Sequence, residues 1–252
     1  MSIEPGLPVA LALGALLVLA LIGHHYGRYG LQGPVLVAGT RALVQLTVVA
    51  LVIAFVVEDL WLSSAFVLVM FATAVLTTSR RVGGLAVWPG AAAAMGVALV
   101  PVLAIILGTG AVPAEGIAVI PVAGIIIGNT MTAHTLAGRR AFDALREGLP
   151  QYEAGLSVGM LPQQAIREII HDRVPEALVP GLDQVRTTGL VTLPGAFIGV
   201  MLGGGSPVQA ATAQVLVLFG IMAAQVITVV LVERLVAAGR LMPDDVGDLL
   251  AD

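Results

Sequence analysis

The sequence predicts an all-α membrane protein, a polytopic bundle of about seven transmembrane helices. Of its 252 residues, 58% are hydrophobic and only 11% are charged, and the mean hydropathy is +1.00. Soluble domains carry about a quarter charged residues, so this surface requires lipid as its solvent. The apolar stretches also run unbroken for about 20 residues, the length of a bilayer-crossing helix, without the period-two alternation of a transmembrane β-barrel.

Seven apolar stretches account for the predicted spans, each about long enough to cross a hydrocarbon core of roughly 30 Å. They run near residues 7–23, 35–57, 61–79, 88–107, 116–136, 187–202 and 211–232. The first is predicted to be a span rather than a secretion signal, because it lacks a basic n-region and is preceded by Glu4. The sixth is the shortest and is interrupted by Pro194 and Gly195.

The basic residues predict the orientation. All 12 are Arg, and seven spans put every one of them on the same side of the membrane. The positive-inside rule then places the N-terminus outside and the C-terminus in the cytosol, with the chain in the plasma (inner) membrane. Six spans would scatter the Arg residues over both sides. They are Arg28, Arg41, Arg80, Arg81, Arg139, Arg140, Arg146, Arg167, Arg173, Arg186, Arg234 and Arg240.

Residues 138–186 form the only long polar stretch, which this orientation places in the cytosol. We expect it to be the coupling segment of a single transmembrane domain, residues 1–252. Pro150 and Pro162 each predict the start of a short helix, because proline is tolerated in a first helical turn. The second helix has an apolar and a polar face, so it either lies on the membrane surface or docks a soluble partner.

Residues 153–159, spelled E-A-G-L-S-V-G, are similar to the EAAxxxG signature of ABC-transporter permeases, with Gly155 in place of the second Ala. In those permeases this cytoplasmic loop is the coupling helix, which sits in a cleft of the ATPase subunit. The resemblance implies ATPase-coupling roles for Glu153, Ala154, Gly155 and Gly159. A phosphate-binding GxxxxGK[ST] loop requires Lys, which the chain lacks, so we predict that it is not an enzyme and that a partner chain hydrolyses any ATP.

Two pairs of polar residues are candidates for a translocation path. Arg41 and Gln45 in the second span are four residues apart and share a helix face. They either line the path, or Arg41 extends to the cytosolic interface along its apolar stem. Gln214 and Gln225 in the last span also share a face, which we expect to point into the bundle.

The fifth span ends in the most polar stretch of any span. Asn129, Met131 and His134 offer amide, thioether and imidazole groups within two turns, and all three are path candidates. Thioether and imidazole groups bind transition metals, so Met131 and His134 are also candidate metal ligands. The alternative is hydrogen bonding between helices. Gly124 and Gly128 predict close approach of a neighbouring helix.

Pro194 breaks the sixth span, because it lacks an N–H group and leaves a backbone carbonyl free inside the membrane. Such breaks are tolerated where they are buried in protein or line a cavity, and in transporters they often mark binding sites. Pro194 is therefore a path candidate, with a packed kink as the alternative. Gly195, Gly199 and Gly203 repeat every four residues, which predicts close packing within the chain or across a homodimer.

Several segments, in order along nearly the whole chain, resemble the FetB-like permease family. They are residues 41–46, 128–131, 153–159 and 188–195, followed by Gly203 and Pro207. This family contains bacterial ABC-type iron-export permeases and is related to plant aluminium-tolerance membrane subunits. The resemblance implies a membrane subunit that exports iron with a separate cognate ATPase. We expect a homodimer in the lipid bilayer, with no cofactor and no nucleic-acid partner. His134 departs from the family pattern, which has a small polar residue there.

Two other classes compete with this interpretation. A secondary transporter or channel for a metal or other small solute would need no ATPase, but no span has an acidic residue at its centre for proton coupling. A lipid-acting enzyme would need a catalytic constellation near one interface. His24 and His25 have no carboxylate close in sequence, and no Ser-centred elbow is present.

Overall fold

The computed structural model describes residues 6–251, and within them the chain is α-helical, with no strand and one isolated bridge between Thr188 and Thr192. The elements are α1 (Leu7–Tyr26), α2 (Gln32–Val56), α3 (Leu60–Val82), η1 (Leu85–Val87), α4 (Trp88–Gly108), α5 (Gly116–Glu147), α6 (Leu149–Ser157), α7 (Pro162–Ile170), η2 (Val174–Leu178), α8 (Val179–Thr187), α9 (Gly195–Leu202), α10 (Pro207–Ala237) and α11 (Asp244–Ala251). The chain divides into two compact units, Met1–Val56 and Val57–Asp252.

The first unit contains α1 and α2, which are joined by a short turn where Arg28 has a positive φ of 52°. Over the bounds given above, neither helix has a buried residue. Because their side chains are mostly apolar, the two helices present hydrophobic surface to their surroundings, as helices in lipid do.

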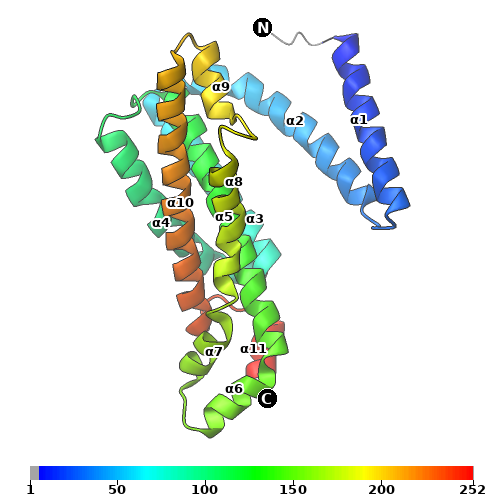
Figure 1. Cartoon of the computed structure of the whole chain (residues 1–252), viewed down its shortest axis with the longest axis vertical. Helices are drawn as coiled ribbons and strands as arrows, with labels where there is room; N and C mark the ends of the chain where they lie inside the picture. Colours follow the sequence, from blue (N-terminus) through cyan, green and yellow to red (C-terminus); the bar gives the residue numbers. More distant parts are fainter. Residues whose placement is uncertain (1–5, 252) are drawn as a thin grey trace. The chain divides into compact units, whose positions relative to one another are not determined.

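The second unit is a helical bundle in which α5 packs against α10, α3 and α4, and α10 also packs against α4 (Figure 1). Its core is apolar and includes the fully buried Ala94, Ile126 and Leu145. α5 has 32 residues and α10 has 31, so each is about 47 Å long at 1.5 Å per residue. Both helices are therefore longer than the hydrocarbon core of roughly 30 Å.

Side-chain caps explain where two of the long helices begin. The carboxylate of Asp59 accepts hydrogen bonds from the N–H groups of Trp61 at 2.7 Å and Leu62 at 3.0 Å, which starts α3. Ser206 starts α10, because its hydroxyl accepts from the N–H of Gln209 at 3.3 Å and the Gln209 side chain accepts from the N–H of Ser206 at 2.8 Å.

The contacts between α3 and α5 indicate which part of α5 lies within the membrane. Gly116 lies against Val57 and Ser63 at the beginning of α3, and Gly138 lies against Val82 at its end. Between Gly116 and Gly138, α5 is therefore level with α3 over about 33 Å, which matches the hydrocarbon core. We call this interval the membrane layer. The C-terminal part of α5 extends beyond it.

Ion pairs connect this extension of α5 to η2 and to the segments around it. They join Arg140 to Glu176 at 3.1 Å, Arg173 to Glu147 at 3.2 Å and Arg146 to Asp245 at 2.6 Å. All of these side chains are about half-exposed or more. The charged end of the unit is thus held by solvent-facing pairs, while the membrane layer is packed with apolar residues.

Six helices within the described residues are long and apolar enough to cross a membrane: α1, α2, α3, α4 with η1, α5 and α10. This confirms the prediction of an all-α, polytopic membrane bundle. The predicted orientation of the termini and the single-domain assignment stay predictions. The sixth predicted span, residues 187–202, differs from expectation because it is not one continuous helix. α8 ends at Thr187 and α9 has only 8 residues, about 12 Å, which is too short to cross alone.

The break has a local cause at each end. Gly189 has a positive φ of 87°, and its N–H donates to the carbonyl of Thr192 at 2.8 Å, which closes a turn. Pro194 has no N–H and an extended ψ of 158°, so the next helix begins only after it. η2, α8 and α9 all contact α10, and Figure 1 shows them following α10 from the end near α7 to the end where α10 begins. Residues 174–202 therefore run along α10 as a broken segment.

Candidate translocation path and coupling site

Two of the polar path candidates meet where α5, α8 and α10 come together. Gln225 of α10 is 5% exposed, and its Nε2 donates to the backbone oxygen of Asn129 on α5 at 3.4 Å. The side chain of Asn129 donates to the carbonyl of Ile125 at 2.9 Å. Gly181 of α8 lies so close that an added Cβ would overlap Oε1 of Gln225. The absence of a side chain at Gly181 thus permits α8 to approach α10 at this junction.

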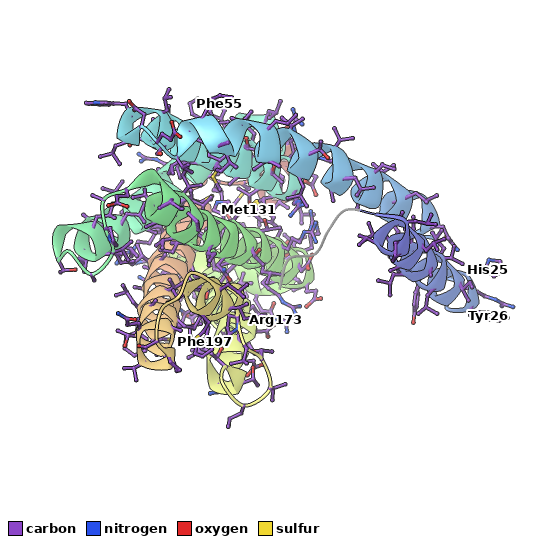
Figure 2. The ribbon with its side chains drawn as sticks, turned by 90° about the horizontal axis from the view of Figure 1, so that it is seen from above. His25, Tyr26, Phe55, Met131, Arg173 and Phe197 are labelled. Carbon is purple, nitrogen blue, oxygen red and sulfur yellow. The ribbon has the colours of Figure 1, made fainter. Side chains whose placement is uncertain are left out.

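His134 lies on the face of α5 that is turned toward α3, and Met131 is half-buried about one turn before it. His134 is fully buried, and its Nδ1 is 2.9 Å from the hydroxyl of Thr78 on α3, which is also 2.8 Å from the hydroxyl of Thr135. Figure 2, seen from above, shows Met131 and Phe197 of α9 on opposite sides of α5. The structure therefore separates Met131 and His134 from the junction of α5 with α8 and α10.

The proposed metal ligands Met131 and His134 stay a prediction. In the described part of the chain, Nε2 of His134 has no hydrogen-bond partner, so a ligand would have to bind at this nitrogen. Across residues 6–251, no three His, Asp or Glu side chains gather in a group that would hold a metal ion. Any ligand at His134 would have to enter a fully buried site between α3 and α5.

The remaining path candidates lie in three different places. Arg41 and Gln45 are on α2 in the first unit, and both are exposed. Gln214 on α10 is 5% exposed, and its Oε1 has no partner within the described residues. Pro194 is half-buried and immediately precedes α9. Within the second unit, the structure thus brings Asn129 and Gln225 together but leaves Gln214 and Pro194 apart from them.

The glycines predicted to allow close packing have different surroundings. A Cβ added at Gly124 would lie 2.7 Å from Cε of Met70, so α3 approaches α5 closely there. A Cβ added at Gly203 would meet the carbonyl of Gly199 at 3.3 Å. No described atom lies within 4 Å of a Cβ added at the other three, Gly128, Gly195 and Gly199. Packing across a homodimer therefore stays a prediction for these three.

α6 and α7 form a helical hairpin, the coupling hairpin, at the end of the unit to which α5 extends (Figure 1). Pro150 lies in the first turn of α6 and Pro162 begins α7, which confirms the predicted helix starts. Gly155 lies against Ala165, since an added Cβ would be 3.2 Å from the Ala165 Cβ. Gly159 has a positive φ of 91°, which only glycine adopts readily, and it turns the chain between the helices.

The tip of the coupling hairpin is apolar and exposed. Val158 is 81% exposed, Leu161 63% and Met160 39%. Glu153 and Ala154, two of the predicted coupling residues, are exposed on α6. A pocket of about 450 Å³ lies beside the tip and is lined by Met160, Gln164, Arg167, Glu168 and His171. This end of the molecule thus offers a hollow with polar walls next to apolar side chains.

Glu233 connects the coupling hairpin to α10. Its side chain is only 11% exposed, and its Oε1 lies 3.3 Å from Nε of Arg167 and 3.1 Å from Nδ1 of His171. Arg167 is on α7 and His171 directly follows it. A buried carboxylate requires such partners, because an unpaired charge is costly away from water.

Sequence reasoning did not identify Glu233 as a functional residue. The available signal was that Glu233 is the only acidic residue in α10, within a helix that is otherwise mostly apolar. Such a residue needs a partner. Its partners are more than 60 positions away along the chain, so only the tertiary structure identifies them.

These features define a class, a polytopic α-helical membrane protein with buried polar contacts between its helices and a helical hairpin beyond its membrane layer. The chain belongs to the family described as Uncharacterised protein family (UPF0014), whose model matches residues 8–239. No solved structure matches it.

Three relatives support this membership. The chain is 30% identical to the probable iron export permease protein FetB of Escherichia coli (strain K12), over 84% of this chain and 82% of that protein. It is 29% identical to the UPF0014 membrane protein STAR2 of Oryza sativa subsp. japonica, over 90% and 80%. It is 27% identical to the protein ALUMINUM SENSITIVE 3 of Arabidopsis thaliana, over 80% and 75%. The resemblance to FetB-like permeases and plant aluminium-related proteins is thereby confirmed.

Proposed function

We propose that this chain is the membrane-spanning permease subunit of an ABC transporter that exports iron with energy from a separate ATPase subunit. The similarity to FetB, which is named as a probable iron export permease, supports both the transport class and the cargo. The observation that most strongly supports the ATPase partner is the coupling hairpin, which joins a sequence similar to a coupling loop with an exposed apolar tip.

The tip of the coupling hairpin is suited to bind another protein. Val158 and Leu161 are largely exposed, on a part of the molecule that lies beyond the membrane layer. Exposed apolar side chains that gather at one place favour a protein interface over water. Gly155 and Gly159 hold the hairpin compact, so it is preorganised to enter a cleft and loses little conformational freedom on binding.

The contacts of Glu233 provide a route from the coupling hairpin to the membrane layer. Arg167 and His171 bind Glu233, and further along α10, Gln225 binds the backbone of Asn129. A displacement of α7 is therefore transmitted through the exposed Arg167 and His171 to the buried Glu233, and so to α10, which holds path candidates. This is the connection that a permease needs to couple nucleotide hydrolysis to transport.

The other parts of the proposal concern assembly. Two copies of the chain form a homodimer in the plasma (inner) membrane, with the coupling hairpin in the cytosol. ATP hydrolysis takes place on the partner, since the chain has no Lys for a phosphate-binding loop. Gly195 and Gly199, beside which no described atom fills the space of a Cβ, are available for contact with the second copy.

The test is co-purification of the chain with its cognate ATPase. Val158→Arg places a charge on the apolar tip and should abolish association and ATP-dependent iron export. Asp248→Arg is the matched control, because Asp248 is also exposed but lies on α11, and it should retain both. Size-exclusion chromatography checks that each variant is folded. Full ATPase binding and export by Val158→Arg would contradict the docking role.

A second measurement separates the transporter classes. The purified chain, reconstituted alone in proteoliposomes, should not move iron until the ATPase and ATP are added. Iron transport by the lone chain without ATP would instead support a secondary transporter or channel.

A further inference from the structure

Two charged residues lie on α8 in the broken segment. Nη1 of Arg186 donates to Oδ1 of Asp183 at 3.3 Å, and the two side chains are 73% and 59% exposed. Gln184 between them is also exposed. The hydroxyls of Thr187 and Thr188 donate to carbonyls one turn earlier in α8, at 2.9 Å and 2.7 Å. α8 therefore presents charged and polar groups, next to the partly exposed Val179 and Leu182, that its own unit does not cover.

If the membrane layer is as defined above, the contact between Gly181 and Gln225 gives the depth of this face, and the end of the segment predicted to be cytosolic, residues 138–186, then lies inside the layer. Gln225 binds Asn129, so Gly181 is level with Asn129, which lies about 13 Å inside the membrane layer from its end at Gly138. From Gly181, α8 runs toward the beginning of α10 (Figure 1). Arg186 is thus about 7 Å deeper still, near the middle of the layer.

Charged side chains at this depth do not face lipid without large cost. Ionisable residues within membrane layers face a bundle interior or a water-filled cavity. The backbone leads to the same conclusion, because residues 188–194 are not helical, and irregular backbone at membrane depth is tolerated only in contact with protein or water. Leu190 is 91% exposed and Val191 78%, so the helices of the second unit do not enclose this turn.

We infer that α8 and the turn at residues 188–194 form the wall of a water-filled path through the membrane, and that Asp183 is the carboxylate that meets a cationic substrate there. The assignment of the wall is independent of the cargo. The role of Asp183 rests on the proposed export of iron.

The wall offers oxygen ligands to a metal cation. Asp183 supplies a carboxylate, Gln184 an amide oxygen, and Thr187 and Thr188 hydroxyl oxygens, which are the ligand types that hard cations prefer. Arg186 balances the charge of Asp183 when no cation is present and competes with a cation for it. Such competition keeps binding weak enough for the ion to leave, as conduction requires.

Cysteine accessibility tests the wall directly, because the chain has no Cys of its own. Gln184→Cys reports the proposed wall, Val158→Cys the aqueous hairpin tip, and Phe219→Cys an apolar, 62% exposed position on α10. Membranes containing each variant are treated with a charged, membrane-impermeant thiol reagent. We expect fast labelling at position 158, slower but complete labelling at 184, and none at 219.

Two outcomes would contradict the assignment of α8 as the wall of a water-filled path. Labelling at 184 as fast as at 158 would mean that α8 lies outside the membrane layer. No labelling at 184, as at 219, would mean that lipid or a second copy of the chain covers this face. Neither outcome depends on transport. The assignment of the wall can therefore be refuted while the proposed iron export is supported, and iron export can be refuted while the wall is supported.

The role of Asp183 is tested in the Gln184→Cys background with Fe²⁺ alone as the probe. We expect Fe²⁺ to slow the labelling, and Asp183→Asn to abolish that protection without changing the labelling rate in the absence of metal. If Fe²⁺ gives no protection, or if protection survives Asp183→Asn because the cysteine itself binds the metal, the role of Asp183 is overturned.

Discussion

Replacing Gly181 with Ala should destabilise the second unit, although alanine is the better helix former. Within a helix, Gly→Ala by itself stabilises by about 1 kcal/mol. At Gly181, however, the added Cβ would overlap Oε1 of Gln225. Gln225 is 5% exposed, so it has little room to move, and moving it breaks its bond to Asn129.

The expected magnitude follows from these opposing contributions. Overpacking costs about 1–3 kcal/mol, and the lost hydrogen bond costs about 1 kcal/mol more. After subtraction of the gain in helix propensity, the free energy of unfolding should fall by about 1–3 kcal/mol. The assay is denaturant titration of the purified chain in mixed micelles. Gly96→Ala on α4 is the matched control, because its Cβ would lie at an ordinary 3.6 Å from Cζ of Phe71, and it should be neutral or slightly stabilising.

A double variant separates the overlap between the added Cβ at position 181 and Gln225 from other causes of lost stability. Gln225→Ala removes the atom that the added methyl group at position 181 would meet, so Gly181→Ala should cost about 1–2 kcal/mol less in the Gln225→Ala background than in the natural chain. If Gly181→Ala costs the same in both backgrounds, or is as harmless as Gly96→Ala, then α8 does not pack on α10 as the structure indicates.

The other predictions concern the charged end of the unit and α5. Glu233→Gln should weaken the link between α7 and α10, so iron export should fall while ATPase binding and basal ATP hydrolysis remain; equal losses of all three would instead indicate misfolding. The hydrogen bond from Arg146 holds the pKa of the Asp245 carboxyl below its usual range. The pKa of this carboxyl is lower in the folded chain than in the unfolded chain, so the Arg146–Asp245 contact stabilises α11 at pH values above the ordinary carboxyl pKa of about 3.9. This stabilisation is lost as the pH falls through the lowered pKa of the folded state. Hydrogen exchange of the α11 amides should therefore accelerate on acidification, and in Asp245→Asn it should be fast at every pH. His134→Ala should lower the melting temperature, because it empties a fully buried site. Unchanged iron-stimulated ATPase activity in both His134→Ala and Met131→Ala would exclude the two residues as metal ligands.

The coupling hairpin illustrates what could be predicted from local sequence. Proline in the first turn and glycine at a positive φ are signals confined to a few residues, so the starts of α6 and α7 were predictable without any tertiary information. Pro194 was also a local signal, and its interruption of the sixth span was expected. The length of the break was not predicted: the turn that Gly189 closes on Thr192 is also local, but its spelling was interpreted as part of a continuous span.

The path candidates illustrate the opposite case. Their helical spacing correctly grouped residues on one helix, but it gave no information about which faces of different helices meet. Asn129 and Gln225 are 96 positions apart and are in contact, whereas His134, close to Asn129 in sequence, faces α3. The pairing of Glu233 with α7 and the packing of Gly181 against Gln225 were inaccessible for the same reason.

The sequence by itself therefore determined that this is a polytopic helical membrane protein, its main membrane-spanning helices and its family, because hydrophobic length and short motifs depend on neighbouring residues. Only the tertiary structure decided that the sixth span is a broken segment, that the coupling hairpin is bound to α10 through Glu233, and that α8 lies against α10 where Gly181 meets Gln225. These features depend on packing between helices that are distant in the chain, where the space left by one glycine sets how close two helices come.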